Sequence, residues 1–412
     1  TYLVSSRLTS VSLNPAEAAP IAGPRHDELK GAPDFQEIKL SNGARLLLQP
    51  DSRLPNLHLR LACLGGPLYE TPGKRGATAL LATLLTKDTR KRSAAQVAQA
   101  IEEVGGAFHS FSGNNVFGLA IEVLPTDVDR ALALLSEAVF SPAFRQQTFS
   151  TERGAQIAEL QQEADDIVTF GKKLLRKKFF GSHPFAIDAA GDEPGLRALE
   201  PRALAELHRA LMIGSNAVLA LAGDFSVKKL APKLRAFLKG FPRAAAPSPS
   251  PRFSGPASGE FTEKQPREQA VVFQAFSGPP LLHDDFYVGE VADELFSGMA
   301  SRLFERVREE KGLAYFVRSE RITGLDTAMF YFYAGTAPAH VNEVFVEIEA
   351  EISRVQSGGV EEAELSRCQV RLKAGRRQSL QPNSARAMHA ALNALYGLPI
   401  NDWKNYDARI DA

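Results

Sequence analysis

Cysteines, long apolar runs and an excess of charge are all scarce in this 412-residue sequence. Its only two cysteines, Cys63 and Cys368, stand singly inside apolar patterns, which excludes a disulfide framework and a paired-cysteine metal site. No apolar run approaches the roughly 18 residues that span a bilayer, so no membrane span is expected. The 48 basic residues balance the 48 acidic ones, and the charge therefore does not favour nucleic acid as a partner.

Local motifs for metal, phosphate or serine chemistry are missing as well. No two of the eight histidines lie within one helical turn of each other, so the sequence has no local zinc-binding pair. It also has no P-loop, no dinucleotide-binding glycine loop and no Gly-x-Ser-x-Gly elbow. Local motifs therefore do not define a self-contained active site.

A long internal repeat is the main feature of the sequence. Gly66-Pro67 closes a strand expected at 57–64, and Gly278-Pro279 closes another expected at 270–276, an offset of 212. Four apolar positions of the helix expected after Pro125 recur after Pro338 at an offset of 213. The repeat predicts an α+β fold of two homologous halves, each a mostly antiparallel sheet packed with helices. The repeated positions are Val128, Leu132, Leu135 and Val139, matched by Val341, Phe345, Ile348 and Ile352.

Composition divides the chain into four segments. We predict an extended arm over 1–34, a first half over 35–243, a linker rich in Pro, Ser and Ala over 244–259, and a second half over 260–412. Counterparts of the strand 216–222 and the helix 227–238 are missing from the second half, which we expect to be incomplete at its end. The chain starts at Thr1, so we expect an upstream segment to have been removed, and a periplasmic location in a bacterium is favoured over a cytoplasmic one.

A run of cations at 172–178 could suggest an anion-binding patch. Its five basic residues alternate with leucine and phenylalanine, as on an amphipathic helix. We therefore predict a solvated helix face rather than an anion site.

Two stretches carry a resemblance to a known family. They are GATALLATLLTKDT at 76–89, with an unusually apolar helix expected over 77–85, and SRLFERVREEKGLAY at 301–315. At these residues the chain resembles the pitrilysin, insulinase and mitochondrial processing peptidase family of zinc metallopeptidases, in particular its two-domain bacterial subunits.

The resemblance implies that the zinc motif of this family is degenerate here. Family members show G-x-A-H-F-L-E-H-M-L-F-K-G-T at the first stretch, with an inverted H-x-x-E-H zinc motif. Ala79 and Thr83 stand where the two zinc-ligating histidines are expected, and Ala82 stands where the catalytic glutamate is expected. None of the three can ligate zinc or activate a bound water in the way of this family. Glu159, aligned with the third ligand, is predicted to be a vestigial or hydrogen-bonded structural carboxylate.

The second stretch matches the family's segment that carries an arginine and a tyrosine seven positions apart. The resemblance implies that Arg308 holds a substrate carbonyl and that Tyr315 donates a hydrogen bond to the oxyanion of the tetrahedral intermediate. The alternative is a solvated helix charge at Arg308 and a half-buried strand aromatic at Tyr315.

These observations predict the noncatalytic subunit of a heteromeric zinc metallopeptidase. We expect this chain to bind no cofactor, and we expect zinc in a homologous partner subunit, in a heterodimer or a dimer of heterodimers that encloses peptide substrates. The alternative is a catalytically inert structural or peptide-binding scaffold of the same fold.

Overall fold

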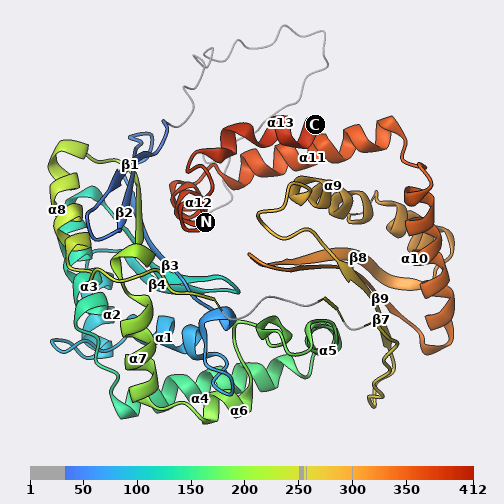
Figure 1. The fold of residues 1–412 in the computed structure, drawn as a ribbon, viewed down its shortest axis with the longest axis horizontal. Coiled ribbons are helices and arrows are strands. Elements are labelled where there is room, and N and C mark those ends of the chain that lie inside the picture. Colours follow the sequence, from blue (N-terminus) through green and yellow to red (C-terminus); the bar gives the residue numbers. More distant parts are fainter. Residues whose placement is uncertain (1–32, 250–254, 257, 299) are drawn as a thin grey trace, which may run out of the picture. The chain divides into compact units, whose positions relative to one another are not determined.

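Two β-sheets organise residues 34–412 in this computed structural model (Figure 1). The structure describes residues 33–249, 255, 256, 258–298 and 300–412. The predicted arm over 1–34 therefore lies outside the described residues except for its last two positions, as does part of the predicted linker. Within the described residues, no helix has both the length and the apolar character needed to cross a membrane.

Among the described residues, the first sheet has six strands in the order β1-β2-β6-β3-β5-β4, and only the β2–β6 pair is parallel. The second sheet has three described strands in the order β7-β9-β8, all antiparallel. The mixed, mostly antiparallel α+β fold predicted from the sequence is thus confirmed. The strands are β1 (Gln36–Lys39), β2 (Arg45–Pro50), β3 (Leu57–Leu64), β4 (Ala107–Ser112), β5 (Val116–Val123), β6 (Val218–Gly223), β7 (Ala270–Ser277), β8 (Ala314–Thr323) and β9 (Ala328–Thr336).

The helices repeat between the halves in the same order. The first residues of α3 and α10 are 213 positions apart, and α11 and α12 begin 216 positions after α4 and α5. The helices are α1 (Ala77–Leu85), α2 (Ala94–Glu102), α3 (Val128–Phe140), α4 (Gln146–Glu163), α5 (Ile167–Phe180), α6 (Glu193–Arg197), α7 (Pro201–Leu211), α8 (Val227–Lys239), α9 (Phe286–Phe296), α10 (Val341–Gln356), α11 (Glu362–Ser379), α12 (Asn383–Tyr396) and α13 (Tyr406–Asp411). The second half also contains a π-helix, η6 (Phe304–Glu310), and the short 3₁₀ helices η7 (Pro338–His340) and η8 (Asp402–Asn405).

The matching helices α5 and α12 are exchanged between the halves. Four alanines of α12 pack on the first sheet against Ala62, Val218, Ala220 and Ala222, so that helix and sheet approach closely. In return, Phe179 and Phe180 of α5 pack with Tyr331 and Tyr333 of β9. Each sheet is therefore covered on one face by a helix from the other half of the sequence.

This exchange corrects the expectation for the basic run on α5. Arg176 is buried and donates hydrogen bonds to the carbonyl of Phe185 at 3.0 Å and to the Asn114 side chain at 3.2 Å. Lys172 forms an ion pair of 2.6 Å with Glu320 of the second sheet. The predicted solvated face was wrong for these two cations, because Arg176 binds residues of the first half and Lys172 binds a carboxylate of the second sheet.

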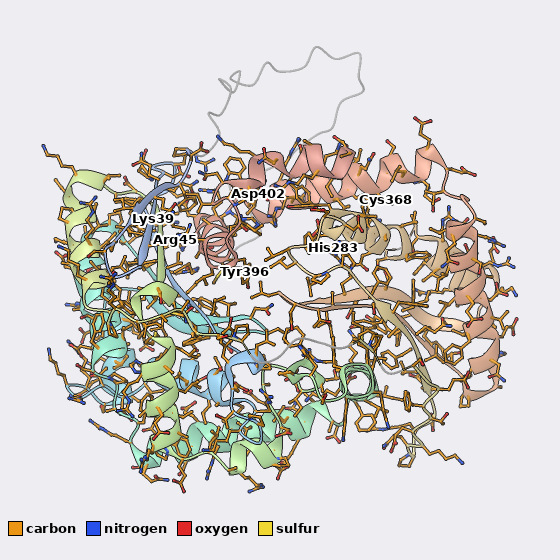
Figure 2. All side chains as sticks on the ribbon, viewed as in Figure 1. Lys39, Arg45, His283, Cys368, Tyr396 and Asp402 are labelled. Carbon is orange, nitrogen blue, oxygen red and sulfur yellow. The ribbon has the colours of Figure 1, made fainter. Side chains whose placement is uncertain are left out.

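The two cysteines are buried and unbridged, as small core residues. Cys63 belongs to the first core, and Cys368 on α11 belongs to the second (Figure 2). Burial raises the pKa of the Cys63 thiol to about 12, so this thiol remains protonated near neutral pH.

Candidate functional site

The stretch that the resemblance assigns to a degenerate zinc motif lies on α1, whose N-terminus is held by a buried carboxylate. Gly76 caps the helix with a φ of 92°, a left-handed conformation that favours glycine. The Glu70 carboxylate accepts hydrogen bonds from the Gly76 N–H at 3.0 Å and the Thr78 N–H at 2.7 Å. Negative charge at this end of a helix is favourable. Because Glu70 is buried, its pKa is raised. The start of α1 is thus fixed by Gly76 and by the Glu70 carboxylate.

The three replaced positions differ in their surroundings. Ala79 and Thr83 are half-buried on one side of α1, whereas Ala82 is only 1% exposed and belongs to the core of the first half. Methyl groups cannot ligate a metal, and a single hydroxyl is a poor zinc ligand.

The carboxylates on α4 do not make up for this loss. Glu159 is exposed, and Glu152 forms an ion pair with Lys87 at 3.0 Å. Across the part of the chain that the structure describes, no three His, Cys, Asp or Glu side chains converge as possible metal ligands. The donor set at α1 and α4 therefore does not fit the zinc ion that the family resemblance implies.

The second candidate group lies where η6 leads into β8. The N–H of Leu313 donates to the carbonyl of Val307 at 2.9 Å, and that of Gly312 donates to the carbonyl of Arg308 at 3.1 Å. These bonds connect the helix end to the first residues of the strand. In the described residues, no hydrogen bond or ion pair joins Arg308 or Tyr315 to α1 or α4.

Arg308 differs from the neighbouring cations in its carboxylate partners. Arg306 and Lys311 both bind Glu347, at 2.9 and 2.5 Å, and Arg302 binds Glu364. The hydrogen bond from Lys311 is the main cause of a lowered pKa at Glu347. Among the described residues, Arg308 has only its chain neighbour Glu309, with 3.8 Å between Nε and Oε1. Its guanidinium therefore keeps most of its hydrogen-bonding capacity.

The Arg308 guanidinium is oriented by an aromatic ring. Its Cζ lies 4.7 Å from the centroid of the Phe304 ring, four positions earlier in η6. A cation over a ring face keeps its N–H edge available for other acceptors. Phe304 was not identified from the sequence, although its spacing from Arg308 in a helical stretch was a usable signal.

Tyr315 is 61% exposed, in contrast to the tyrosines of β9. The hydroxyl groups of Tyr331 and Tyr333 both donate to Glu320, and burial, followed by this hydrogen bond, raises the pKa of both phenols. Tyr315 was predicted under the alternative interpretation to be half-buried, and that interpretation is wrong in this respect.

Two depressions on the described surface lie elsewhere. One of about 440 Å³ is bordered by Arg45 of β2 and by the chain around Asn401, next to Asp402 (Figure 2). Another of about 640 Å³ runs between α3 and α8. Neither is lined by the residues of the two candidate groups.

Taken together, the duplicated fold, the capped α1 frame and the η6–β8 segment define a chain with the architecture of a two-half metallopeptidase. Residues 47–191 match the family described as insulinase (peptidase family M16), and residues 198–372 match the one described as peptidase M16 inactive domain. This chain belongs to the M16 peptidase family.

Relatives and solved structures agree with this assignment. A protein of Streptomyces coelicolor named as an uncharacterized zinc protease is 29% identical over 73% of this chain and 68% of its own length. A crystal structure from Pseudomonas fluorescens titled peptidase M16 inactive domain has a TM-score of 0.84 at 20% identity, over 92% of each chain. A chain of complex III2 from Candida albicans has a TM-score of 0.78 at 18% identity, over 92% of this chain and 89% of its own. The two structures show similarity of fold.

Proposed function

We propose that this chain is the noncatalytic subunit of a heteromeric zinc metallopeptidase and that it supplies Arg308 and Tyr315 to the active site of a homologous partner. The observation that carries the proposal is the difference between Arg308 and its neighbours. Arg302, Arg306 and Lys311 are neutralised by carboxylates of the second half, whereas Arg308 is left with Glu309 alone. This difference leaves the Arg308 guanidinium able to bind a substrate carbonyl.

The chemistry of the two side chains suits peptide hydrolysis. The zinc ion expected in the partner would activate water and polarise the scissile carbonyl. Tyr315 is an exposed neutral donor that can stabilise the oxyanion, and the planar guanidinium of Arg308 can hold a substrate backbone carbonyl. Neither role requires a metal ligand on this chain, which agrees with the donor set at α1.

The experiment compares peptide hydrolysis and zinc content for three samples. They are this chain, the homologous subunit from the same genome that has the complete H-x-x-E-H motif, and their mixture. We expect hydrolysis that requires both chains, with zinc in the motif-bearing subunit. Hydrolysis by this chain alone, with one zinc bound per molecule, would overturn the proposal.

A substitution in the mixture tests the role of Tyr315. Tyr315→Phe removes one oxyanion donor and should lower kcat by roughly 10² to 10³, with co-elution of the subunits unchanged. Tyr396→Phe is the matched control, because Tyr396 lies at the end of α12 and outside the η6–β8 segment (Figure 2). Equal turnover in Tyr315→Phe and wild type would exclude the proposed role.

The alternative is a scaffold that binds peptides without contributing to catalysis. A free sheet edge favours it, because β4 pairs only with β5 in the described residues and an extended peptide can add to such an edge. A scaffold predicts peptide binding by this chain, and mixture activity that is insensitive to Tyr315→Phe.

A further inference from the structure

The alternation of side chains breaks at the start of β8. In a regular strand, residues two positions apart point to the same face of the sheet. Ala314 packs in the core of the second half together with Val317, whereas Phe316 packs on the opposite face with the residues around α5. Ala314 and Phe316 therefore point to opposite faces, although they are two positions apart.

The pairing with β9 explains this break. Ala314 pairs with Thr336, and Phe316 pairs with the next residue, Gly335, so Tyr315 has no partner in the register. Tyr315 is thus the extra residue of a β-bulge, a feature that can redirect a side chain. Without the bulge, Tyr315 would share the face of Val317, which is 2% exposed, instead of being 61% exposed.

Gly335 provides the space that this arrangement needs. A Cβ at Gly335 would lie 2.4 Å from Cε1 and 2.5 Å from Cζ of the Phe316 ring. The φ angle of Gly335 is not positive, so the glycine is required for space and not for backbone conformation. The ring therefore occupies the position that any side chain at 335 would take.

A second contact fixes the chain on the other side of the bulge. The Thr336 hydroxyl donates to the carbonyl of Leu313 at 2.5 Å. Leu313 is joined in turn to the end of η6 through its N–H. Thr336 holds the chain before Tyr315, and the Phe316 ring holds it after Tyr315. Tyr315 is therefore the bulged residue whose side chain is exposed.

We infer that Phe316 and Gly335 are positioning residues that hold Tyr315 in a β-bulge, and so present its phenol outside the core. The inference rests on the proposed function for its catalytic consequence, but the positioning itself is a property of this chain alone. Any side chain at 335, or loss of the ring at 316, should let the strand return to regular alternation and draw Tyr315 toward the core.

The test measures Tyr315 directly in the isolated chain. Nitration by tetranitromethane, quantified by mass spectrometry on the peptide that contains Tyr315, reports the accessibility of its ring. We expect the rate to fall several-fold in Gly335→Ala and in Phe316→Ala. Gly375→Ala is the control, since a Cβ there meets nothing within 4 Å, and it should nitrate like wild type. Circular dichroism establishes that each variant is folded, and Phe316→Ala keeps the test decisive if Gly335→Ala does not fold.

Activity of the assembled peptidase then distinguishes the positioning of Tyr315 from its proposed catalytic role. In Gly335→Ala, kcat should fall toward the value of Tyr315→Phe, a loss of roughly 10²-fold, with KM unchanged. Wild-type nitration in both positioning variants overturns the inference, even if Tyr315→Phe is inactive. Slower nitration together with full activity of Tyr315→Phe leaves the positioning intact and refutes the proposed function instead.

Discussion

Arg386 on α12 joins the exchanged helix to the first sheet, and its removal should destabilise the protein strongly. The residue is 6% exposed, and its guanidinium reaches the Asp51 carboxylate at 2.6 Å and the Gln49 side chain at 2.8 Å. All three of its nitrogens donate hydrogen bonds. The remaining acceptors are the carbonyls of Leu380 and Gln381 and the side chain of Asn383.

The expected loss of unfolding free energy in Arg386→Met depends on the Asp51 carboxylate that remains buried. Removing one partner of a buried ion pair typically costs about 3–5 kcal/mol, because the other charge is left buried. Asp51 keeps an ion pair of 2.6 Å with Arg53, whose hydrogen bonds are the main cause of the lowered pKa of Asp51. We therefore expect a loss near the lower limit, about 3 kcal/mol in the free energy of unfolding.

Urea denaturation, followed by circular dichroism and by the fluorescence of the single tryptophan, measures this loss. Arg202→Ala is the control, since Arg202 forms an exposed ion pair with Glu206 on α7 and should cost less than about 1 kcal/mol. If Arg386→Met costs no more than Arg202→Ala, the helix exchange does not depend on this contact and the reasoning is refuted.

Two further predictions concern the second half. Phe304→Leu removes the ring beneath Arg308, an exposed contact of about 0.5–1 kcal/mol. The KM of the assembled peptidase for a peptide should therefore rise about two- to five-fold, with kcat unchanged. A fall in kcat at constant KM would contradict this prediction. Burial, followed by the charge of Arg376, lowers the pKa of His389 to about 3, so the unfolded chain takes up a proton below pH 6.5 that the folded chain does not. Stability from the neutral His389 is present above this pH and is lost as the pH falls toward 3, at about 1.4 kcal/mol per pH unit. His389→Gln should remove this pH dependence of the unfolding free energy. If the unfolding free energies of wild type and variant differ by the same amount from pH 7 to pH 5, the proposed effect of His389 is excluded.

Local patterns were sufficient to predict several elements to the residue. The helix 77–85 and the strand 57–64 have the predicted bounds. Both are rich in apolar residues and are flanked by glycine, proline or polar residues, and such signals depend on nearby residues alone.

The candidate site was only partly predictable. The sequence identified Arg308 and Tyr315 through their surrounding motif, but several cations in that motif have the same local pattern. Only the folded chain shows that Glu347 and Glu364 bind the others, because these carboxylates come from α10 and α11. The bulge at Tyr315 was not visible either, since Ala314 to Val317 is a continuous apolar stretch without alternation.

The sequence by itself determined the two-fold repeat, the class of fold and the loss of zinc ligands from α1, because each depends on residue type at a fixed spacing. The tertiary structure alone decided that α5 and α12 change places, that Arg308 is left with only its chain neighbour Glu309 as a carboxylate partner among the described residues, and that Tyr315 lies in a β-bulge. These outcomes depend on contacts between residues far apart in the chain, such as Lys172 with Glu320 and Asp51 with Arg386, for which a local pattern carries no information.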